Sequence, residues 1–365
     1  MIIFIVIILV MVLVLYLFLQ RTPFGKLPSG QRLERIKQSP NYKNGAFQNL
    51  SHTPNFTNGA NYYTVLKKFF FEKKERRYPA DIIPAVKTDL HRLNRHDDVL
   101  VWFGHSSYFM QVDGKRILVD PVLSGSASPL AYGTKAFKGA DVYSTDDIPA
   151  IDYLFISHDH WDHLDYRTLK KLQPNIKTII GGLGVGAHLE RWGFDPAIIH
   201  ELDWNDTLSL EDGFTVHATP ARHFSGRGLA RNKALWLSFV LHTPAHKLFL
   251  GGDSGYDNHF AEIGQRFGEF DLAILENGQY DKSWSHIHLM PGEMLQAAKD
   301  LKAKRIFPVH SSKFALGNHA WDEPLNLVTH NNESANLAII TPMIGEAVNL
   351  KDNTQQFTQW WKKVK

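Results

Sequence analysis

The chain of 365 residues contains no cysteine. This absence excludes disulfide bridges, thiolate metal ligands and cysteine nucleophiles, and it leaves the redox compartment open. A Gly-x-Ser-x-Gly motif is also missing, so nothing indicates a serine nucleophile of the α/β-hydrolase kind. The formal net charge is only +3, and we therefore expect no nucleic-acid partner. A homo-oligomer is neither indicated nor excluded.

Histidine, by contrast, is well represented, with 19 residues that supply many candidate metal ligands. The hydrophobic content of 44% and the charged content of 21% are those of an ordinary globular protein. Disorder is therefore not expected, and a chain of this length can bury a large core.

The first residues, Met1 to Leu19, carry no charged side chain. As a helix this run would be roughly 28 Å long, which is enough to cross a bilayer. The run lacks the basic start and the small-residue cleavage site of a signal peptide, so we predict an uncleaved single-pass anchor over residues 1–20. Basic side chains follow the run but do not precede it, which predicts a cytoplasmic catalytic domain. They are Arg21, Lys26, Arg32, Arg35 and Lys37.

Residues 21–95 are predicted to form an extended arm that includes a basic aromatic segment. Asn44-Gly45 and Asn58-Gly59 mark turns in the first part of the arm. The basic aromatic segment, residues 61–78, mixes tyrosine and phenylalanine with lysine and arginine, a composition that suits lipid headgroups. We favour the alternative, a solvated helix whose aromatic side chains pack against the protein.

Residues 96–350 are predicted to form the hydrolase domain, because short β-type runs and helical stretches alternate there. The predicted strands are 99–103, 108–112, 116–119, 153–156, 178–180, 215–217, 235–241, 247–250, 272–275, 305–309 and 338–341, and the helices are near 166–172, 186–192 and 291–301. Asp113-Gly114 predicts a hairpin. Together these elements predict an α+β fold of two sheets packed face to face with helices outside. Residues 351–365 are interpreted as a C-terminal tail that either lies on the surface or contacts a membrane interface.

The most informative motif is the run His158-Asp159-His160-Trp161-Asp162-His163. It follows the predicted strand 153–156, and Asp165 can cap the helix after it. On an extended backbone the first two histidines face the same way, while the closing aspartate and histidine are carried round to a second position. Such ligands suit two divalent metal ions in one cleft, with Zn²⁺ as the first choice and Mn²⁺ or Fe as alternatives.

Further motifs accompany this run. They are Gly104-His105-Ser106-Ser107, Val119-Asp120-Pro121, Pro220-Ala221-Arg222-His223, Gly251-Gly252-Asp253-Ser254-Gly255-Tyr256, and Val309-His310 followed by Phe314-Ala315-Leu316. In order and spacing the set resembles the metallo-β-lactamase superfamily, and more closely its N-acylphosphatidylethanolamine phospholipase D branch. The resemblance covers roughly residues 102–324 and implies a four-layer αββα sandwich.

The resemblance also implies a set of metal ligands. One ion would be bound by His158, His160 and His223, the other by Asp162, His163 and His310, and Asp253 would bridge the two. The last three ligands along the chain each follow a β-type run, where a rigid scaffold presents such groups. Asp162, Asp253 and a substrate-side histidine, His288, are the implied catalytic residues. His105, Tyr256 and Glu276 are candidate supports that orient the ligands, and the role of His286 is open.

The expected chemistry is attack on phosphorus or a carbonyl carbon by a hydroxide held between the metals. Our first hypothesis is a phosphodiesterase of the phospholipase D type that acts on N-acylphosphatidylethanolamine in a membrane. It would release phosphatidic acid and an N-acylethanolamine.

Three alternatives remain. The same site could hydrolyse a lactone or a cyclic or sugar phosphate. Related proteins with two irons reduce dioxygen or nitric oxide, but they resemble His-x-Glu-x-Asp, whereas position 160 is histidine here. The chain could also be a membrane-tethered protein without activity, although every expected ligand is present.

Overall fold

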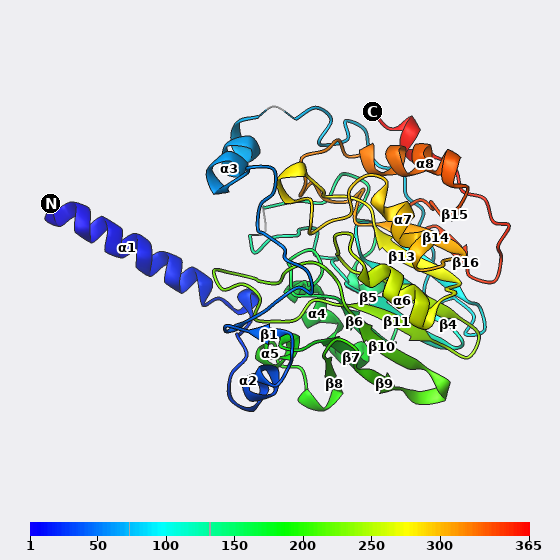
Figure 1. Ribbon diagram of the computed structural model, residues 1–365, viewed down its shortest axis with the longest axis horizontal. Coiled ribbons are helices and arrows are strands. Elements are labelled where there is room, and N and C mark those ends of the chain that lie inside the picture. The colour runs from blue at the N-terminus through cyan, green and yellow to red at the C-terminus, as the bar shows by residue number, and fades with distance from the viewer. Residues whose placement is uncertain (73, 131–132) are drawn as a thin grey trace.

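The computed structural model describes residues 1–72, 74–130 and 133–365. The body of the protein consists of two seven-stranded sheets packed face to face, with helices on both outer faces (Figure 1). The strand order is β16-β3-β4-β5-β6-β7-β8 in the first sheet and β15-β14-β13-β12-β11-β10-β9 in the second. The predicted four-layer αββα sandwich is therefore confirmed.

The first sheet carries two helices on its outer face, α4 (Tyr166–Leu172) and α5 (Val185–Arg191). Along β3, Val99 and Val101 face these helices, while Leu100 and Trp102 face the second sheet, because successive side chains of a strand alternate. The predicted hairpin turn at Asp113-Gly114 joins two of the strands. The strands are β3 (Val99–Trp102), β4 (Tyr108–Val112), β5 (Lys115–Val119), β6 (Ile151–Ile156), β7 (Ile176–Gly182), β8 (Ile199–Leu202) and β16 (Ala347–Asn349).

The second sheet is covered by α6 (His259–Phe267), α7 (Glu293–Asp300) and α8 (Glu323–Ala335). In α6 the buried side chains Phe260, Ile263 and Phe267 recur at helical spacing, which places them on the face toward the sheet. The strands are β9 (Thr207–Ser209), β10 (Thr215–Thr219), β11 (Ser238–His242), β12 (Lys247–Leu250), β13 (Leu272–Glu276), β14 (Arg305–Val309) and β15 (Ala338–Ile339). Short 3-10 turns lie at Thr22–Phe24, Thr145–Asp147, Gln173–Asn175, Pro196–Ile198, Glu211–Gly213, Lys282–Trp284 and Trp360–Lys363.

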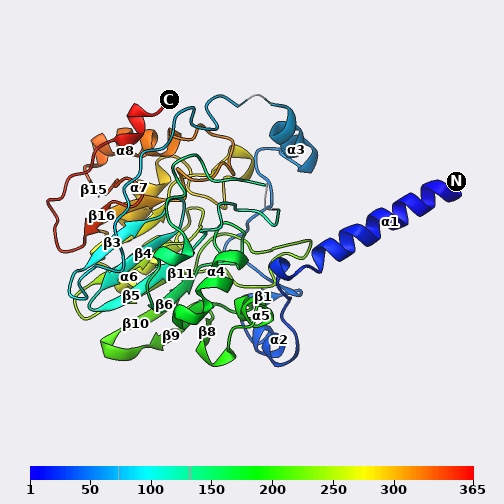
Figure 2. The same ribbon diagram turned by 180° about the vertical axis from the view of Figure 1, so that it is seen from behind.

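The apolar helix α1 (Ile2–Leu19) projects away from the body and buries none of its residues (Figures 1 and 2). Its mean hydropathy is 3.6, and within the described ranges it is the one helix long and apolar enough to cross a membrane. Whether it does so, and in which orientation, stays a prediction.

The arm of residues 21–95 lies on the body and contains more structure than predicted. It holds α2 (Gly30–Lys37), the hairpin strands β1 (Tyr42–Lys43) and β2 (Ala46–Phe47), and α3 (Tyr62–Phe71). Asn44-Gly45 forms the predicted turn between β1 and β2. Ile36 and Phe47 are fully buried and hold the arm against the domain.

Two aromatic side chains of α3, those of Tyr63 and Phe71, do not pack as we expected. Tyr63 is 73% exposed and Phe71 is 83% exposed, and Leu66 between them is also exposed. The favoured interpretation of a helix packed by its aromatics is therefore wrong for these residues. Lys73, which belongs to the same predicted segment, lies outside the described residues.

The C-terminal residues are part of the core. Trp360 is 3% exposed, Trp361 is fully buried, and both belong to the hydrophobic cluster that also contains inward-facing residues of the two sheets. The indole nitrogen of Trp361 donates a hydrogen bond to Asn326 of α8. Neither a surface tail nor an interfacial contact describes these tryptophans, so that interpretation is wrong for them, whereas residues 351–359 are exposed or half-buried.

Candidate metal centre

The predicted ligands meet where several strands end. His158 to His163 follow β6, His223 follows β10, Asp253 follows β12 and His310 follows β14. Asp165 caps α4 as predicted and closes the loop that begins at His158, because its carboxylate accepts a hydrogen bond from the backbone N–H of Arg167. The strands come from both sheets, so the sandwich brings distant parts of the chain to one edge.

A first group consists of His158, His160 and His223. The Nδ1 atom of His160 lies 2.9 Å from Nε2 of His158 and 3.2 Å from Nε2 of His223. Burial lowers the pKa of His158 and His223 well below the usual value and that of His160 to about 4. Three neutral imidazoles whose ring nitrogens converge in this way can offer their lone pairs to one cation.

A second group contains Asp162, His163 and His310, together with His105. Nε2 of His163 lies 3.4 Å from Oδ2 of Asp162, and Nε2 of His105 lies 2.9 Å from the same oxygen. The ring of His163 is oriented by Asp120, whose Oδ2 lies 2.8 Å from Nδ1. This carboxylate contact fixes the tautomer and directs Nε2 into the centre.

Asp253 lies between the two groups, and each of its oxygens faces one of them. Oδ1 is 3.2 Å from Nε2 of His163 and 3.2 Å from Nδ1 of His310. Oδ2 is 3.9 Å from Nε2 of His158 and 3.7 Å from Nε2 of His223. A carboxylate in this position can bridge two metal ions.

Two atoms at this centre have no hydrogen-bond partner among the described residues, although both are buried. They are Nε2 of His163 and Oδ1 of Asp253, which lie 3.2 Å apart; Nδ1 of His105 is also unpaired but is not one of this facing pair. Buried polar groups are almost always satisfied, so unpaired atoms that face each other indicate a missing ligand. The donor set of imidazole nitrogens and carboxylate oxygens therefore fits divalent metal ions such as Zn²⁺.

The charges of the centre lead to the same conclusion. Burial alone lowers the pKa of His163, but the carboxylates of Asp253, Asp162 and Asp120 outweigh it and raise that pKa well above the usual value. Burial raises the pKa of Asp253 to about 6. The carboxylates thus demand a positive charge at this point, which a bound metal ion would supply in place of a proton.

His288 and Glu276 form a buried pair next to the centre. Nδ1 of His288 lies 2.6 Å from Oε2 of Glu276, while the other carboxylate oxygen accepts hydrogen bonds from the backbone N–H groups of Ser254 and Leu289. Burial raises the pKa of Glu276 well above the usual value and lowers that of His288. Both shifts favour a neutral pair, in which Oε2–H donates to Nδ1 and Nε2–H is left for the cavity.

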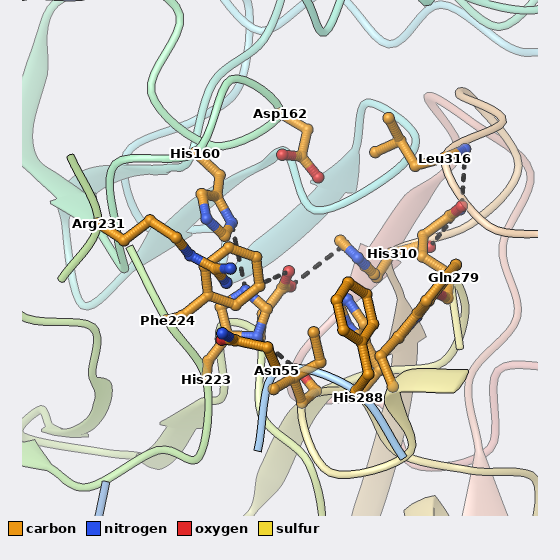
Figure 3. Close-up of a pocket in the computed structure, with 14 residues that line it drawn as sticks. Asn55, His160, Asp162, His223, Phe224, Arg231, Gln279, His288, His310 and Leu316 are labelled. Atoms are coloured by element: carbon orange, nitrogen blue, oxygen red, sulfur yellow. Dashed lines mark hydrogen bonds and ion pairs between the residues drawn. The ribbon is translucent and has the colours of Figure 1, made fainter. Parts of the chain in front are cut away.

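The centre opens into a cavity of about 270 Å³ (Figure 3). Its floor holds predicted ligands and His288, and Phe56 of the arm contributes to its wall. The remaining wall is mostly apolar and is formed by Phe224, Trp284, Ile287 and Leu316, together with the polar Asn55, Gln279 and Arg231. A polar floor under apolar walls suits a substrate with one polar group and one hydrocarbon part.

The loop that carries the first ligands is also held from its outer side. Arg227 is buried, its Nη1 donates hydrogen bonds of 2.8 Å to the Asp159 carbonyl and 2.7 Å to the Leu164 carbonyl, and its Cζ lies 3.9 Å from the ring centre of Trp161. Nη2 of the same guanidinium donates to the Pro23 carbonyl at 2.9 Å.

The connector is the segment after α1, residues 20–29. Besides Pro23, its Lys26 N–H donates to Nδ1 of His188 at 3.1 Å, and Nε2 of His188 lies 3.2 Å from the Asp159 carboxylate. The ring of Phe24 packs edge-on against Trp161. The connector is therefore joined to the loop that contains His158 and His160.

Some residues of the site were missed or undervalued in the sequence. Asp120 lies in a quoted motif but was not predicted to orient His163, and His105 was considered only as a support although it contacts Asp162 directly. Arg227 and Arg231 belong to a loop of glycine and charged residues that carries no recognisable pattern, so no local signal identified them.

The chain is similar to known proteins over most of its length. The family model of the beta-lactamase superfamily domain matches residues 115–311. An uncharacterized protein of Mycobacterium tuberculosis is 36% identical over 331 residues, which are 89% of this chain and 88% of that protein. A metal-dependent hydrolase of Pyrobaculum aerophilum is 27% identical over 215 residues, covering 59% of this chain and 84% of that one.

Two further similarities concern a named enzyme and a solved structure. The mitochondrial N-acyl-phosphatidylethanolamine-hydrolyzing phospholipase D of Saccharomyces cerevisiae is 35% identical over 233 residues, or 61% of this chain and 49% of that enzyme. The metallo hydrolase Igni18 of Ignicoccus hospitalis superimposes with a TM-score of 0.54 at 20% identity, covering 69% of this chain and 98% of that one, and this likeness shows the fold alone. The chain belongs to the beta-lactamase superfamily, among the metal-dependent hydrolases of that family.

Proposed function

We propose that the protein hydrolyses a phosphodiester bond in an N-acylated phospholipid, as a phospholipase D does. The observation that carries the proposal is the combination of a polar floor rich in metal ligands with apolar walls in one cavity. The yeast relative, named for hydrolysis of N-acyl-phosphatidylethanolamine, supports the substrate class. The apolar helix α1 would hold the protein where such lipids are found.

Metal ions would be held by His158, His160 and His223 on one side and by Asp162, His163 and His310 on the other, with Asp253 between them. When bound, they supply an activated water and neutralise the negative charge that develops on the phosphate oxygens. The imidazoles of His158 and His223 are neutral, as ligands must be, because burial lowers their pKa well below the usual value.

The neutral pair of Glu276 and His288 would supply the proton that the leaving group requires. With Oε2–H of Glu276 donating to Nδ1, the Nε2–H of His288 is available to an oxygen in the cavity. Proton transfer from Nε2 to the departing alkoxide would accompany cleavage of the P–O bond. The apolar residues Phe56, Trp284 and Ile287 would exclude water and hold the acyl chain.

The test is turnover of N-acylphosphatidylethanolamine in mixed micelles by the full chain loaded with Zn²⁺ or Mn²⁺. Product analysis by mass spectrometry should detect phosphatidic acid and an N-acylethanolamine. Lactones and sugar phosphates are assayed in parallel, because the same centre could hydrolyse them. If lipid phosphodiesters are not hydrolysed under either metal, the proposal is wrong.

A His288→Gln variant tests the proposed proton donor. Its metal content should equal that of the unmodified chain, while kcat should fall by roughly 100-fold to 10,000-fold. A substrate with a more acidic leaving group, such as a nitrophenyl diester, should restore most of the lost rate because it needs less protonation. An equal loss on both substrates would argue against this role.

A further inference from the structure

One cationic side chain in the cavity has no assigned role. Of the described residues that line the cavity, Arg231 is the only lysine or arginine. The guanidinium of Arg231 forms no ion pair or hydrogen bond with another described residue, although its Cζ lies 4.1 Å from the ring centre of Phe224. The charge of this residue is therefore available to a ligand.

Phe224 places this charge close to the predicted metal centre. The ring centre of Phe224 lies 4.3 Å from that of His160 and 4.8 Å from that of His223. Figure 3 shows Arg231 and Phe224 beside His160 on one side of the cavity, whereas Gln279 and Leu316 lie on the other. One aromatic ring thus separates the guanidinium from two imidazoles of the first group.

The stacking leaves the donors of the guanidinium free. A guanidinium that lies over a ring uses its face, so the N–H groups along its edge can still donate hydrogen bonds. Those N–H groups form a planar fork that matches two oxygens of a phosphate. A lysine could not present the same pair of donors.

Electrostatics also favour an anion near Arg231. Divalent cations bound at the predicted centre would repel this guanidinium, and no described carboxylate pairs with it to offset that repulsion. A negatively charged ligand that lies between the metals and Arg231 would attract the metals on one side and the guanidinium on the other.

We propose that Arg231, supported by Phe224, forms an anion-binding subsite that takes the non-bridging oxygens of a phosphodiester. This inference rests on the proposed function, because it assumes that the substrate occupies this cavity. It goes beyond that function by identifying the side chain that selects an anionic phosphodiester over a neutral ester or lactone.

Calorimetry with two matched ligands tests the subsite without turnover. Dibutyl phosphate carries one negative charge, whereas tributyl phosphate is a neutral triester of similar chemistry. Both are titrated into the Zn²⁺-loaded full chain in detergent, and into Arg231→Gln, Arg231→Lys and Arg266→Gln. Arg266 is a suitable control because its guanidinium also lies over a phenylalanine, Phe267, at 4.7 Å but does not line the cavity.

Arg231→Gln should weaken dibutyl phosphate binding by roughly 10-fold to 100-fold and change tributyl phosphate binding less than twofold. The affinity of Arg231→Lys for dibutyl phosphate should lie between those of Arg231→Gln and the unmodified chain. The affinity of Arg266→Gln should equal that of the unmodified chain. With bis(nitrophenyl) phosphate as substrate, the loss should appear mainly in KM. Metal content and melting temperature should stay unchanged in all variants.

Three results would overturn the proposal. They are equal weakening of both ligands in Arg231→Gln, no weakening of dibutyl phosphate, and no binding of dibutyl phosphate to the unmodified chain. Failure of the proposed function looks different, because the chain could then bind dibutyl phosphate through Arg231 and still leave lipid phosphodiesters intact.

Discussion

At the scale of single residues, Asp253 is the side chain on which both halves of the centre depend. Its two oxygens face different groups of imidazoles, Oδ1 toward His163 and His310 and Oδ2 toward His158 and His223. A histidine ligand such as His160, in contrast, belongs to one group only. Loss of Asp253 should therefore reduce metal binding more than loss of His160 does.

Metal content after substitution measures this difference. We expect about two ions per chain in the unmodified protein, about one in His160→Ala and close to none in Asp253→Ala. Elemental analysis of protein dialysed against Zn²⁺ gives the stoichiometry. His217→Ala, a histidine on β10 outside the centre, serves as the control. Equal metal content in all four proteins would refute the ligand assignment.

A second residue, Asp98, makes stability depend on pH away from the centre. Burial raises its pKa, but the contacts with His246, the Asp113 N–H and Lys351 outweigh burial and hold it below the ordinary value of 3.8. Because the folded pKa is depressed, the stabilisation is fully present above 3.8 and is lost as the pH falls through the folded pKa.

Urea unfolding of the metal-free protein and of Asp98→Asn tests this dependence. The free energy of unfolding should differ most at neutral pH, and the difference should shrink as the pH falls below about 4. Metal-free protein is used so that release of metal by acid does not contribute. A difference that stays constant down to pH 3 would mean that the Asp98 charge is not its source.

Single residues also show what the sequence could and could not predict. The candidate ligands stood out in the sequence because the run His158 to His163 combines four side chains able to coordinate a metal within six positions. The pairing of Asp120 with His163 and the stacking of Arg231 on Phe224 were not recognisable. The first depends on how two loops from distant parts of the chain approach each other, and the second on how a single loop folds back on itself. Neither leaves a periodic pattern.

At the scale of elements, the loop after β6 is supported by a segment that lies far from it in the sequence. Arg227 donates hydrogen bonds to the carbonyls of Asp159 and Leu164 on this loop and to Pro23 of the connector. Backbone acceptors that are buried and lose their donor cost about 1–3 kcal/mol each. Arg227 therefore contributes both to stability and to the shape of the loop.

An Arg227→Met variant should reveal both contributions. We expect a lower free energy of unfolding, by about 1–3 kcal/mol for each carbonyl left unpaired, and weaker Zn²⁺ binding in chelator competition. Arg266→Met, an exposed arginine on α6, is the matched control. If the variant loses stability but binds Zn²⁺ as tightly as the unmodified chain, Arg227 does not shape the ligand loop.

Element prediction succeeded where patterns were strong and failed where elements were short or mixed. The strands β4, β12 and β14 match the predicted ranges because each is a mostly apolar run with a single polar or charged residue. The strand β8 contains His200 and Glu201 among its four residues, so the alternation that marks a strand is absent. The helices α6 and α8 and the strands β9 and β16 were missed as well.

At the scale of the whole molecule, α1 and the body are nearly independent. The helix buries none of its residues against the protein, while the connector after it is fixed by His188 and Arg227. Removal of α1 alone should therefore leave the sandwich intact, because no packing contact of the core is lost.

Deletion of residues 2–19 tests this independence together with the predicted anchor. The truncated chain should move from a carbonate-resistant membrane fraction to the soluble fraction, with the melting temperature and the metal content of the unmodified chain. A truncated chain that stays with the membrane would show that another surface, such as the exposed side chains of Tyr63 and Phe71 on α3, binds lipid.

The architecture of the molecule was predicted better than its boundaries. Alternating strands and helices indicated two sheets with helices outside, and the structure has this arrangement. The sequence did not show that Trp361, four residues from the end of the chain, is fully buried in the main hydrophobic cluster. A bulky residue near a terminus can be buried in the core or can contact another surface, and only the fold shows which of the two occurs.

The short connector limits the distance between the cavity and a membrane that holds α1. If α1 lies in a bilayer, the cavity can move no farther from that bilayer than a few fixed residues allow, because Pro23 and Lys26 are already bound to the catalytic body. The protein would then act in cis, on lipids of the membrane that holds it, and an opposing membrane would be out of range. Vesicles that carry the protein should therefore spare labelled lipid supplied in separate vesicles.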